Sequence, residues 1–524
     1  MSTVSDAEDN WRPRGNIWVI AVVVTLGAFM EVLDTTIVNV ALPHIAGSLS
    51  VSNDDATWSL TVYLIANGIV LTISGSLSRM LGRKHFFLIC IAVFTLASFG
   101  CGLSTSFPQL LICRAIQGFF GGGLQPTQQA IILDTFPQDK RQAAFSLTAI
   151  ATIIAPVVGP LVGGYLTDTY SWHLIFLINV PIGVLTFFGV MHYVEDSPTV
   201  KRLRKTAPRF DYVGTGFIAL ALGSMELFTD RGEDLDWFGS SAILLVASIC
   251  AIGFIFGIGY LLYTDNPVVD LRVFKNRNFA LGWLQIGIMG LVLYASAVLI
   301  PQFAQQQLGY TATWAGLVLA PGGVVLAALI PVVGRILNKV PAKFVIAAGG
   351  LALACSLFYS SHLIPQENFE SLVILRATQT AALSLLFVPI SSIAYSTLAK
   401  EQQGDAAALF SMARNVFGGV GISISTALIT EGSQSSQQNL VGHLNPSYQP
   451  FNVLMQHIEQ AVINTGTSAN GAVQVAMAQV YQMLQTQTAV LAYNRVFVLT
   501  GILALVMIPT ALLMSNIKTK AGAG

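Results

Sequence analysis

Two carboxylates stand inside the first long apolar run of the sequence. Glu31 and Asp34 are three residues apart between Ile17 and Pro43, and this spacing places them on the same face of a helix. Two carboxylates close together in a medium of low dielectric raise each other's proton affinity. The pair therefore has the property that a proton-coupling site needs, and a purely structural role is the alternative for each acid.

A guanidinium stands in another apolar run. Arg114 stays charged at physiological pH and needs acceptors wherever it is buried, so we expect Asp34 or a backbone carbonyl to be its partner. If Asp34 is the partner, protonation of the acid weakens the pair and links a proton to the movement of one helix against another. A static tether between helices is the alternative. For Arg376, which has no acidic residue in the span expected to face it, we expect a structural role.

Four further polar residues fall inside or at the edge of apolar runs. An ionisable side chain at the centre of a bilayer costs at least about 2.5–3.5 kcal/mol, so each one requires a reason. The candidates for substrate or proton handling are Glu226, Arg414, Asn39 and Gln117. Glu226 lies four residues before Asp230, and simple reach to the membrane interface is the alternative for it.

The sequence contains no signature of an enzyme or a metal site. The five cysteines lie in apolar stretches without metal-type spacing. The G-x-S-x-G, H-E-x-x-H and P-loop patterns are also absent. We therefore predict no catalytic residue, no metal and no cofactor, and a proton gradient as the energy source.

The composition indicates the elements that position these residues. Of the 524 residues, 54% are hydrophobic and 10% are charged, where a soluble domain has about 25% charged residues, and the mean hydropathy is +0.67. A lipid bilayer is therefore the expected surrounding, and the balanced net charge of +0 gives no sign of a nucleic-acid partner.

Apolar runs of about 20 residues in lipid must be helices, because each backbone group has to be satisfied within its own segment. We predict an all-α membrane protein with fourteen spans, at 17–43, 56–78, 85–104, 107–130, 142–167, 172–193, 211–229, 239–263, 279–305, 312–334, 343–362, 371–396, 406–430 and 494–516.

The basic residues predict how the spans face. Lys and Arg gather on the cytoplasmic side of membrane proteins, and here 21 of the 26 basic residues fall on one side of the predicted topology. We therefore expect a multi-pass protein with both termini in the cytoplasm. The basic residues on that side are Arg12, Arg14, Arg79, Arg83, Lys84, Lys140, Arg141, Lys201, Arg202, Arg204, Lys205, Arg209, Arg272, Lys275, Arg277, Arg335, Lys339, Lys343, Lys400, Lys518 and Lys520.

The connection before the last span is unusually long. Residues 432–492 are rich in Gln, Ser and Asn and contain no Lys or Arg, so we place this loop outside. Its stretch 451–486 has helical apolar spacing with an interruption near Gly466 to Gly471. A helical hairpin packed on the bundle and a docking surface for another protein are the two alternatives.

An internal repeat divides the chain. The segment from Gly75 to Lys84 resembles that from Gly334 to Lys343, the Arg-Ala-x-Gln around Arg114 recurs around Arg376, and Pro43 matches Pro301. The offsets of 259, 262 and 258 agree on one displacement. We predict six spans in 1–193, two inserted spans with their cytoplasmic flanks in 194–277, and six spans in 278–524.

Glycine and proline are concentrated in the predicted fifth span. Gly159 and Gly163 are four residues apart, a spacing that allows close helix approach. The full set in this span is Pro156, Gly159, Pro160, Gly163 and Gly164.

These motifs resemble the fourteen-span drug:proton antiporters of the EmrB/QacA branch of the major facilitator superfamily. The resemblance covers almost the whole chain, and its main motifs are LDTTIVNVALP, RAIQGFFGG and GPLVGGYL. It implies a major facilitator fold, alternating access between two six-helix bundles and proton-driven efflux across the bacterial inner membrane. It also implies an EmrA-type periplasmic adaptor and an outer-membrane channel as partners.

The resemblance assigns roles to individual residues. It places proton coupling on Asp34 and Arg114 and conformational switching on the glycines and prolines of the fifth span and on Gly75, Gly82, Arg83 and Lys84. The chain departs from the family pattern at Arg79, where an aspartate is usual, which puts the charge relay of that motif in question. Glu31 replaces a neutral polar residue and would favour cationic substrates.

The function that these features predict is export of hydrophobic or amphipathic toxic compounds in exchange for protons. The alternative is a dedicated proton-driven exporter of one metabolite, siderophore or lipid, because the residues of a substrate pocket are not readable from the sequence.

Overall fold

The computed structural model describes residues 11, 13–138, 140–205, 210–232, 235–399, 402–442, 444–445, 447–464 and 468–515. The sequence-based predictions made on Arg12, Arg209, Lys400, Gly466, Lys518 and Lys520 lie outside these described residues.

Thirteen helical segments of the described chain are long and apolar enough to cross a membrane. Seven lie in the first 263 residues: α2 (Ile17–Ile37, continued by η1, Val38–Val40), α4 (Asn53–Leu81), α5 (Arg83–Gly102), α8 (Arg141–Thr169), α9 with α10 (Leu174–Leu177, Asn179–Tyr193), α12 (Tyr212–Arg231) and α13 (Ser241–Tyr263). Six follow: α14 (Arg277–Gln306), α15 (Ala312–Leu337), α16 (Ala342–Ser360), α17 with α18 (Phe369–Ser384, Phe387–Tyr395), α19 (Gln403–Val441) and α21 with α22 (Ala469–Leu505, Met507–Leu512).

The one predicted span that is not among these thirteen, 107–130, is formed by two shorter helices. These are α6 (Phe107–Gly121) and α7 (Leu124–Thr135), which meet at Gly122 and Gly123. A Cβ on Gly122 would lie 2.3 Å from the Asn67 carbonyl oxygen, and one on Gly123 would lie 2.6 Å from the Cys90 sulfur. The two glycines are therefore needed because neighbouring helices pass very close at this join.

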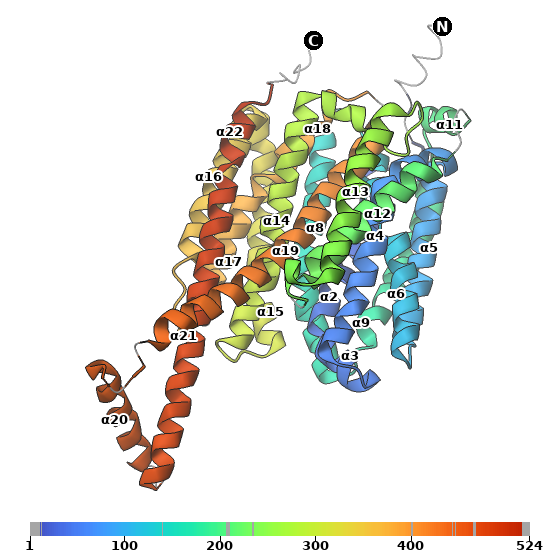
Figure 1. Cartoon of the computed structure of the whole chain (residues 1–524). Coiled ribbons are helices and arrows are strands. Elements are labelled where there is room, and N and C mark those ends of the chain that lie inside the picture. The colour runs from blue at the N-terminus through green and yellow to red at the C-terminus, as the bar shows by residue number, and fades with distance from the viewer. Residues whose placement is uncertain are drawn as a thin grey trace.

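The helices form two bundles and an inserted pair, as Figure 1 shows. The first bundle comprises α2 to α10 and the second comprises α14 to α22. They meet where α8 contacts α15 and where α19 contacts α4 and α7. The inserted helix α12 contacts both α4 and α19, while α13 packs mainly on α12. The predicted all-α architecture of two six-helix bundles plus two inserted helices is thereby confirmed.

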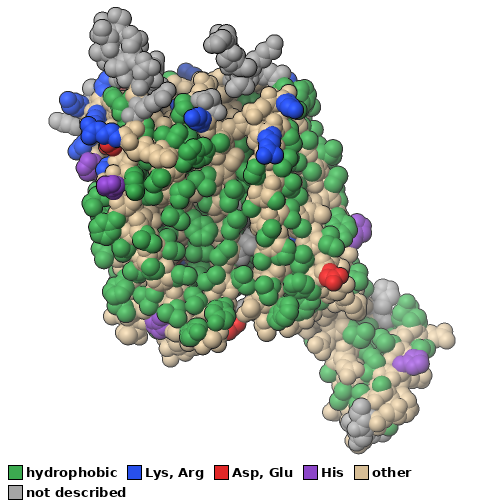
Figure 2. Space-filling model, turned by 180° about the vertical axis from the view of Figure 1, so that it is seen from behind, with side chains coloured by type: hydrophobic (Ala, Val, Ile, Leu, Met, Phe, Trp, Pro, Cys, Tyr) green, Lys and Arg blue, Asp and Glu red, His purple; other side chains and the backbone are tan. Residues whose placement is uncertain are grey.

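The outer surface has a wide apolar flank and one strongly basic end. Figure 2 shows the Lys and Arg side chains gathered at one end, above a flank of hydrophobic side chains. On α13, for example, Leu245, Ile255 and Phe256 are 60–69% exposed. Such a surface is compatible with lipid and not with water. We call the Lys- and Arg-rich end, which includes α11 (Pro198–Lys205), the basic end, and the end that carries α3 (Leu42–Leu49) the opposite end.

The segment 432–492 is helical over most of its length. Helix α19 continues to Val441, α20 spans Gln449–Asn464 and α21 begins at Ala469. The predicted hairpin is therefore present. The alternative that packs it on the bundle is wrong, because α20 packs along α21 and the two project away from the bundles (Figure 1). We call α20 and the projecting part of α21 the hairpin extension.

Candidate functional site

The centre of the first bundle contains a buried ion pair. Arg114 Nη1 of α6 lies 2.6 Å from Asp34 Oδ2 of α2, and both side chains are fully buried. Two amides also donate to Asp34 Oδ1 at 2.8 Å each, from Gln117 on α6 and from Asn179 on α10. Charge-assisted hydrogen bonds of this length are strong. Asp34 thereby connects three helices, and as a carboxylate it has acceptor sites for all three bonds.

Arg114 is held on its other sides by neutral groups. Its Nε donates to the Ser59 carbonyl oxygen at 3.0 Å, and its Nη1 donates to Gln117 at 3.0 Å. The guanidinium carbon also lies 4.1 Å from the centre of the Tyr63 ring, a distance at which the ring face attracts a cation. Both partners that the sequence offered, Asp34 and a backbone carbonyl, are used.

Glu31 has a separate set of partners. Its carboxylate accepts from Asn67 of α4 at 3.0 Å and from Gln125 of α7, and its side chain is 1% exposed. Arg414 of α19 attracts this carboxylate from the second bundle. Glu31 therefore lies at the junction between the bundles, whereas Asp34 lies within the first.

Arg414 is buried with few acceptors. The side chain is 1% exposed, its Nε donates to Asn415 at 3.5 Å, and its guanidinium carbon lies 5.8 Å from the centre of the Phe387 ring. Neither Nη atom has a hydrogen-bond partner in the described chain. Such donors are costly to leave unpaired, and the groups that act on this charge are Asn415, the Phe387 ring and, by attraction, Glu31.

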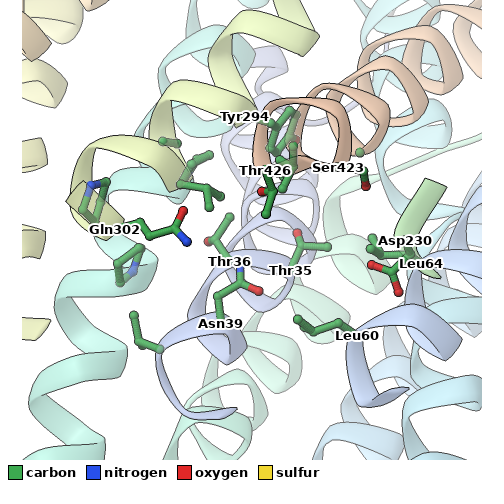
Figure 3. A pocket seen from close by; sticks show the side chains of 18 of the residues that line it. Thr35, Thr36, Asn39, Leu60, Leu64, Asp230, Tyr294, Gln302, Ser423 and Thr426 are labelled. Carbon is green, nitrogen blue, oxygen red and sulfur yellow. The ribbon is translucent and has the colours of Figure 1, made fainter. Parts of the chain in front are cut away.

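A cavity of about 440 Å³ lies between the bundles, within the range of 300–1,000 Å³ that is common for sites of drug-sized ligands. Figure 3 shows Thr35 and Asn39 from the first bundle, Tyr294 and Thr426 from the second, and Asp230 from α12 around it. Of the predicted site residues, Asn39, Glu226, Pro156 and Pro160 line the cavity, and so do the repeat-related Pro43 and Pro301. Asp34, Arg114, Glu31, Gln117 and Arg414 do not line it.

The repeat mate of Arg114 has no ion pair in the described chain. Arg376 is fully buried, and its Nη1 donates to Ser296 at 2.7 Å and to Gln379 at 3.5 Å. Ser296 belongs to α14, the helix that corresponds to α2 in the repeat. The arginine is thus retained in the second bundle, while the acid that would match Asp34 is not.

The fifth-span motif brings α8 against the helix that holds Asp34. A Cβ on Gly159 would lie 2.3 Å from Thr36 Oγ1, and one on Gly163 would lie 2.9 Å from the Ile37 carbonyl oxygen. Helix α8 is continuous through Pro156 and Pro160, and Gly164 is buried in it. The two helices therefore pack closely here, because α8 presents no side chain of its own toward Thr36 and Ile37 of α2.

The segment from Gly75 to Lys84 forms a set of contacts at the basic end. Gly82 has a φ of +87°, which only glycine adopts readily. The next two residues are anchored by acids, because the Lys84 amide donates to Asp196 at 2.9 Å and Arg83 lies 2.6 Å from Asp134. These partners were not identified from the sequence, because Asp134 lies at the end of a helix and Asp196 in the connection after α10, where an exposed position is the default expectation.

Arg79 forms an ion pair that closes the basic end. It lies 2.5 Å from Asp405, whose side chain is 5% exposed, on α19 of the second bundle. A Cβ on Gly75 would lie 2.6 Å from Asp405 Oδ1, so glycine is needed for this approach. The sequence put the charge relay of this motif in question because of Arg79; the structure instead gives that arginine an acid in the other bundle, which sequence reasoning missed.

Other contacts join the bundles at the same end. The Tyr395 hydroxyl donates to Gln129 at 2.8 Å, and its ring stacks on Phe145 with centroids 5.7 Å apart. Gln142 also donates to the Gly334 carbonyl oxygen at 3.2 Å. The basic end is therefore closed, and the cavity lies in the half of the molecule nearer the opposite end.

Comparisons with known proteins agree with this architecture. The family model of the Major Facilitator Superfamily matches residues 24–423. The chain is 33% identical to the multidrug export protein EmrB of Escherichia coli K12 over 94% of both chains. It is 30% identical to the fatty acid resistance protein FarB of Neisseria gonorrhoeae over 92% of this chain and 93% of that one.

A solved structure supports the fold. The crystal structure of the human organic anion transporter MFSD10 matches with a TM-score of 0.58 and 12% identity, over 94% of this chain and all of that one. On the family model and the identity to EmrB, the chain belongs to the major facilitator superfamily of membrane transporters. Within that superfamily it is of the EmrB type.

Proposed function

We propose that the protein exports hydrophobic and amphipathic toxic compounds across the bacterial inner membrane in exchange for protons. The observation that carries the proton coupling is the buried Asp34–Arg114 pair, with its two additional amide donors. Similarity to EmrB, a multidrug export protein, supports the export of many compounds.

The proposed coupling starts with protonation of Asp34. A neutral carboxyl no longer attracts Arg114 as an anion and has one proton to donate, so the network between α2, α6 and α10 must rearrange. Helix α2 carries Thr35 and Thr36 of the cavity wall and packs closely on Gly159 and Gly163 of α8. Asp34 is thereby connected to the cavity through helix α2. In this proposal, protonation of Asp34 changes the shape of the cavity although Asp34 does not line it.

We further propose the orientation and the two-state cycle. The basic end is cytoplasmic, both termini included, in accordance with the distribution of Lys and Arg. The closed contacts around Arg79 and Tyr395 then correspond to an outward-facing state. In this proposal, residues 1–193 and 278–524 rock against each other, and 194–277 form the inserted unit.

The hairpin extension is proposed to bind an EmrA-type periplasmic adaptor, which leads to an outer-membrane channel. At 1.5 Å per residue, the 39 residues of α19 and the 37 of α21 reach about 58 Å and about 55 Å, well beyond a hydrocarbon core of about 30 Å. Apolar side chains on the extension, among them Met477 and Tyr481, are more than half exposed. A partner that covers them is the expected reason for their exposure.

Proton coupling is tested with the variant Asp34→Asn in proteoliposomes. We expect drug-induced proton release to fall at least tenfold, because the asparagine cannot bind and release a proton. The control is Asp168→Asn, an equivalent change at an exposed position at the end of α8. A well-folded Asp34→Asn protein that still exchanges protons for drug at the control's rate would refute the role of Asp34.

A further inference from the structure

The charged groups of the cavity come from the inserted helix. Among the described residues that line it, the charged side chains are Glu226 and Asp230, both on α12, and none is Lys or Arg. The two acids are one helical turn apart, so they lie on the same face of α12. The inserted pair is therefore not only a spacer between two bundles, because it supplies one wall of the cavity.

The packing of α12 fixes where these acids point. Helix α12 contacts α4 of the first bundle and α19 of the second, and it covers the side of the cavity between them. A Cβ on Gly419 of α19 would lie 3.4 Å and 3.7 Å from the two carboxylate oxygens of Glu226. The absence of a side chain at position 419 leaves the space that this carboxylate occupies.

The two acids differ in their partners. Asp230 accepts from the Thr61 hydroxyl, and its Oδ2 lies 3.9 Å from Arg231 Nε. No hydrogen bond or ion pair to the Glu226 carboxylate is present in the described part of the chain, and the charge that acts on it most strongly is that of Asp230, which is also negative. A carboxylate at membrane depth without a cationic partner is costly, so it provides a strong attraction for a cation that enters the cavity.

The remaining lining suits an amphipathic organic cation. Tyr294, Leu60, Leu64 and Ile422 supply aromatic and aliphatic surface, and Gln302 and Asn415 supply neutral polar groups. Aromatic rings and carboxylates together favour organic ammonium or phosphonium groups, which carry charge without requiring many hydrogen bonds. None of the described lining residues carries a positive charge that could pair with an anionic substrate.

We propose that α12 determines the substrate class of the cavity, with Glu226 as the counter-charge for lipophilic organic cations. This inference rests on the proposed export function. It adds a preference for cationic substrates, which the sequence analysis had attributed to Glu31. Glu31 does not line the cavity, and its donor Asn67, which does, lies between Glu31 and the cavity. Glu226 and Asp230 line the cavity directly, and of these two Glu226 is the one without a hydrogen bond or ion pair to its carboxylate in the described residues.

The test compares a cation with a neutral compound in the same proteoliposomes under an imposed pH gradient. Tetraphenylphosphonium is the cationic probe and Nile red is the neutral one. We expect Glu226→Gln to lower the ratio of cation to neutral transport at least tenfold and Glu226→Asp to restore most of it. Glu431→Gln is the matched control, because Glu431 lies exposed on α19 outside the cavity lining.

Binding of tetraphenylphosphonium to the purified protein gives a readout that does not require transport. We expect Glu226→Gln to weaken it about tenfold, as the loss of about 1.4 kcal/mol would do. Equal losses for both probes, or cation binding unaffected by Glu226→Gln, would overturn the proposal for α12. Failure of the wild-type protein to move either probe against a proton gradient would instead reject the proposed export function.

Discussion

At the scale of single residues, the two acids of α2 are not equivalent, although they are three residues apart. Asp34 has a guanidinium within 2.6 Å, whereas Glu31 has two neutral amide donors and a more distant arginine in the other bundle. The contacts of Asp34 therefore lie within one bundle. The charge of Glu31 contributes an attraction between the two bundles.

The two repeated arginines allow a stability prediction. Arg114→Met should lower the melting temperature by several degrees, because breaking a buried pair and leaving Asp34 charged costs about 3–5 kcal/mol. Arg376→Met should leave it unchanged or raise it, because that arginine has neutral partners and its Nε and Nη2 have no hydrogen bond in the described chain. Thermal unfolding of the detergent-solubilised variants measures both, and equal destabilisation would contradict the assigned difference.

At the scale of elements, the hairpin extension combines an apolar core with apolar side chains that are exposed on its outside. The hairpin extension has its own small apolar core of Met455, Ala476 and Val480. This core is made within the extension, so the exposed apolar side chains on its outside are not needed to hold it together. They are available for a partner.

Adaptor binding by this element is tested with Tyr481→Lys. Tyr481 is 51% exposed, and a lysine there places a charge on the surface that we propose to be covered. We expect co-purification of an EmrA-type adaptor to fall at least tenfold. Tyr170→Lys, an exposed tyrosine at the end of α8, should leave it unchanged. If the adaptor binds both variants as well as it binds the wild type, the surface around Tyr481 is not part of the adaptor-binding site.

At the scale of the whole molecule, the state observed depends on contacts between bundles at the basic end. The Arg79–Asp405 pair joins α4 to α19, and the stacking of Tyr395 on Phe145 lies at the same end. In the proposed two-state cycle, these contacts are lost when the basic end opens. Their combined free energy is therefore part of the balance between the two states, and a change of about 1.4 kcal/mol shifts that balance tenfold.

Charge reversal tests this contribution. Asp405→Arg or Arg79→Asp alone places like charges together and should favour opening of the basic end, whereas the double exchange restores an opposite pair and should restore closure. Spin labels at positions 85 and 339, which are exposed at this end in the first and second bundles, can measure the separation in a cysteine-free background. Identical distance distributions in all four proteins would show that this pair does not affect the equilibrium.

Much of the architecture follows from the sequence by itself. Long apolar runs in lipid must be helices because no water satisfies their backbone groups, so the spans could be predicted, and the rarity of charge at membrane depth singled out Asp34 and Arg114 as partners. Sequence spacing also gave the hairpin, because helical periodicity does not depend on the bilayer.

Only the tertiary structure decided how these helices are turned toward one another. Spacing along a chain shows which residues share a face of one helix, but not which other helix that face meets. The placement of Glu226 in the cavity, the pairing of Arg79 with Asp405 and the separate partners of Glu31 all depend on side-chain packing between helices far apart in sequence. The projection of the hairpin depends on it as well, because only contact between helices determines whether an amphipathic helix lies against the bundle or along its neighbour.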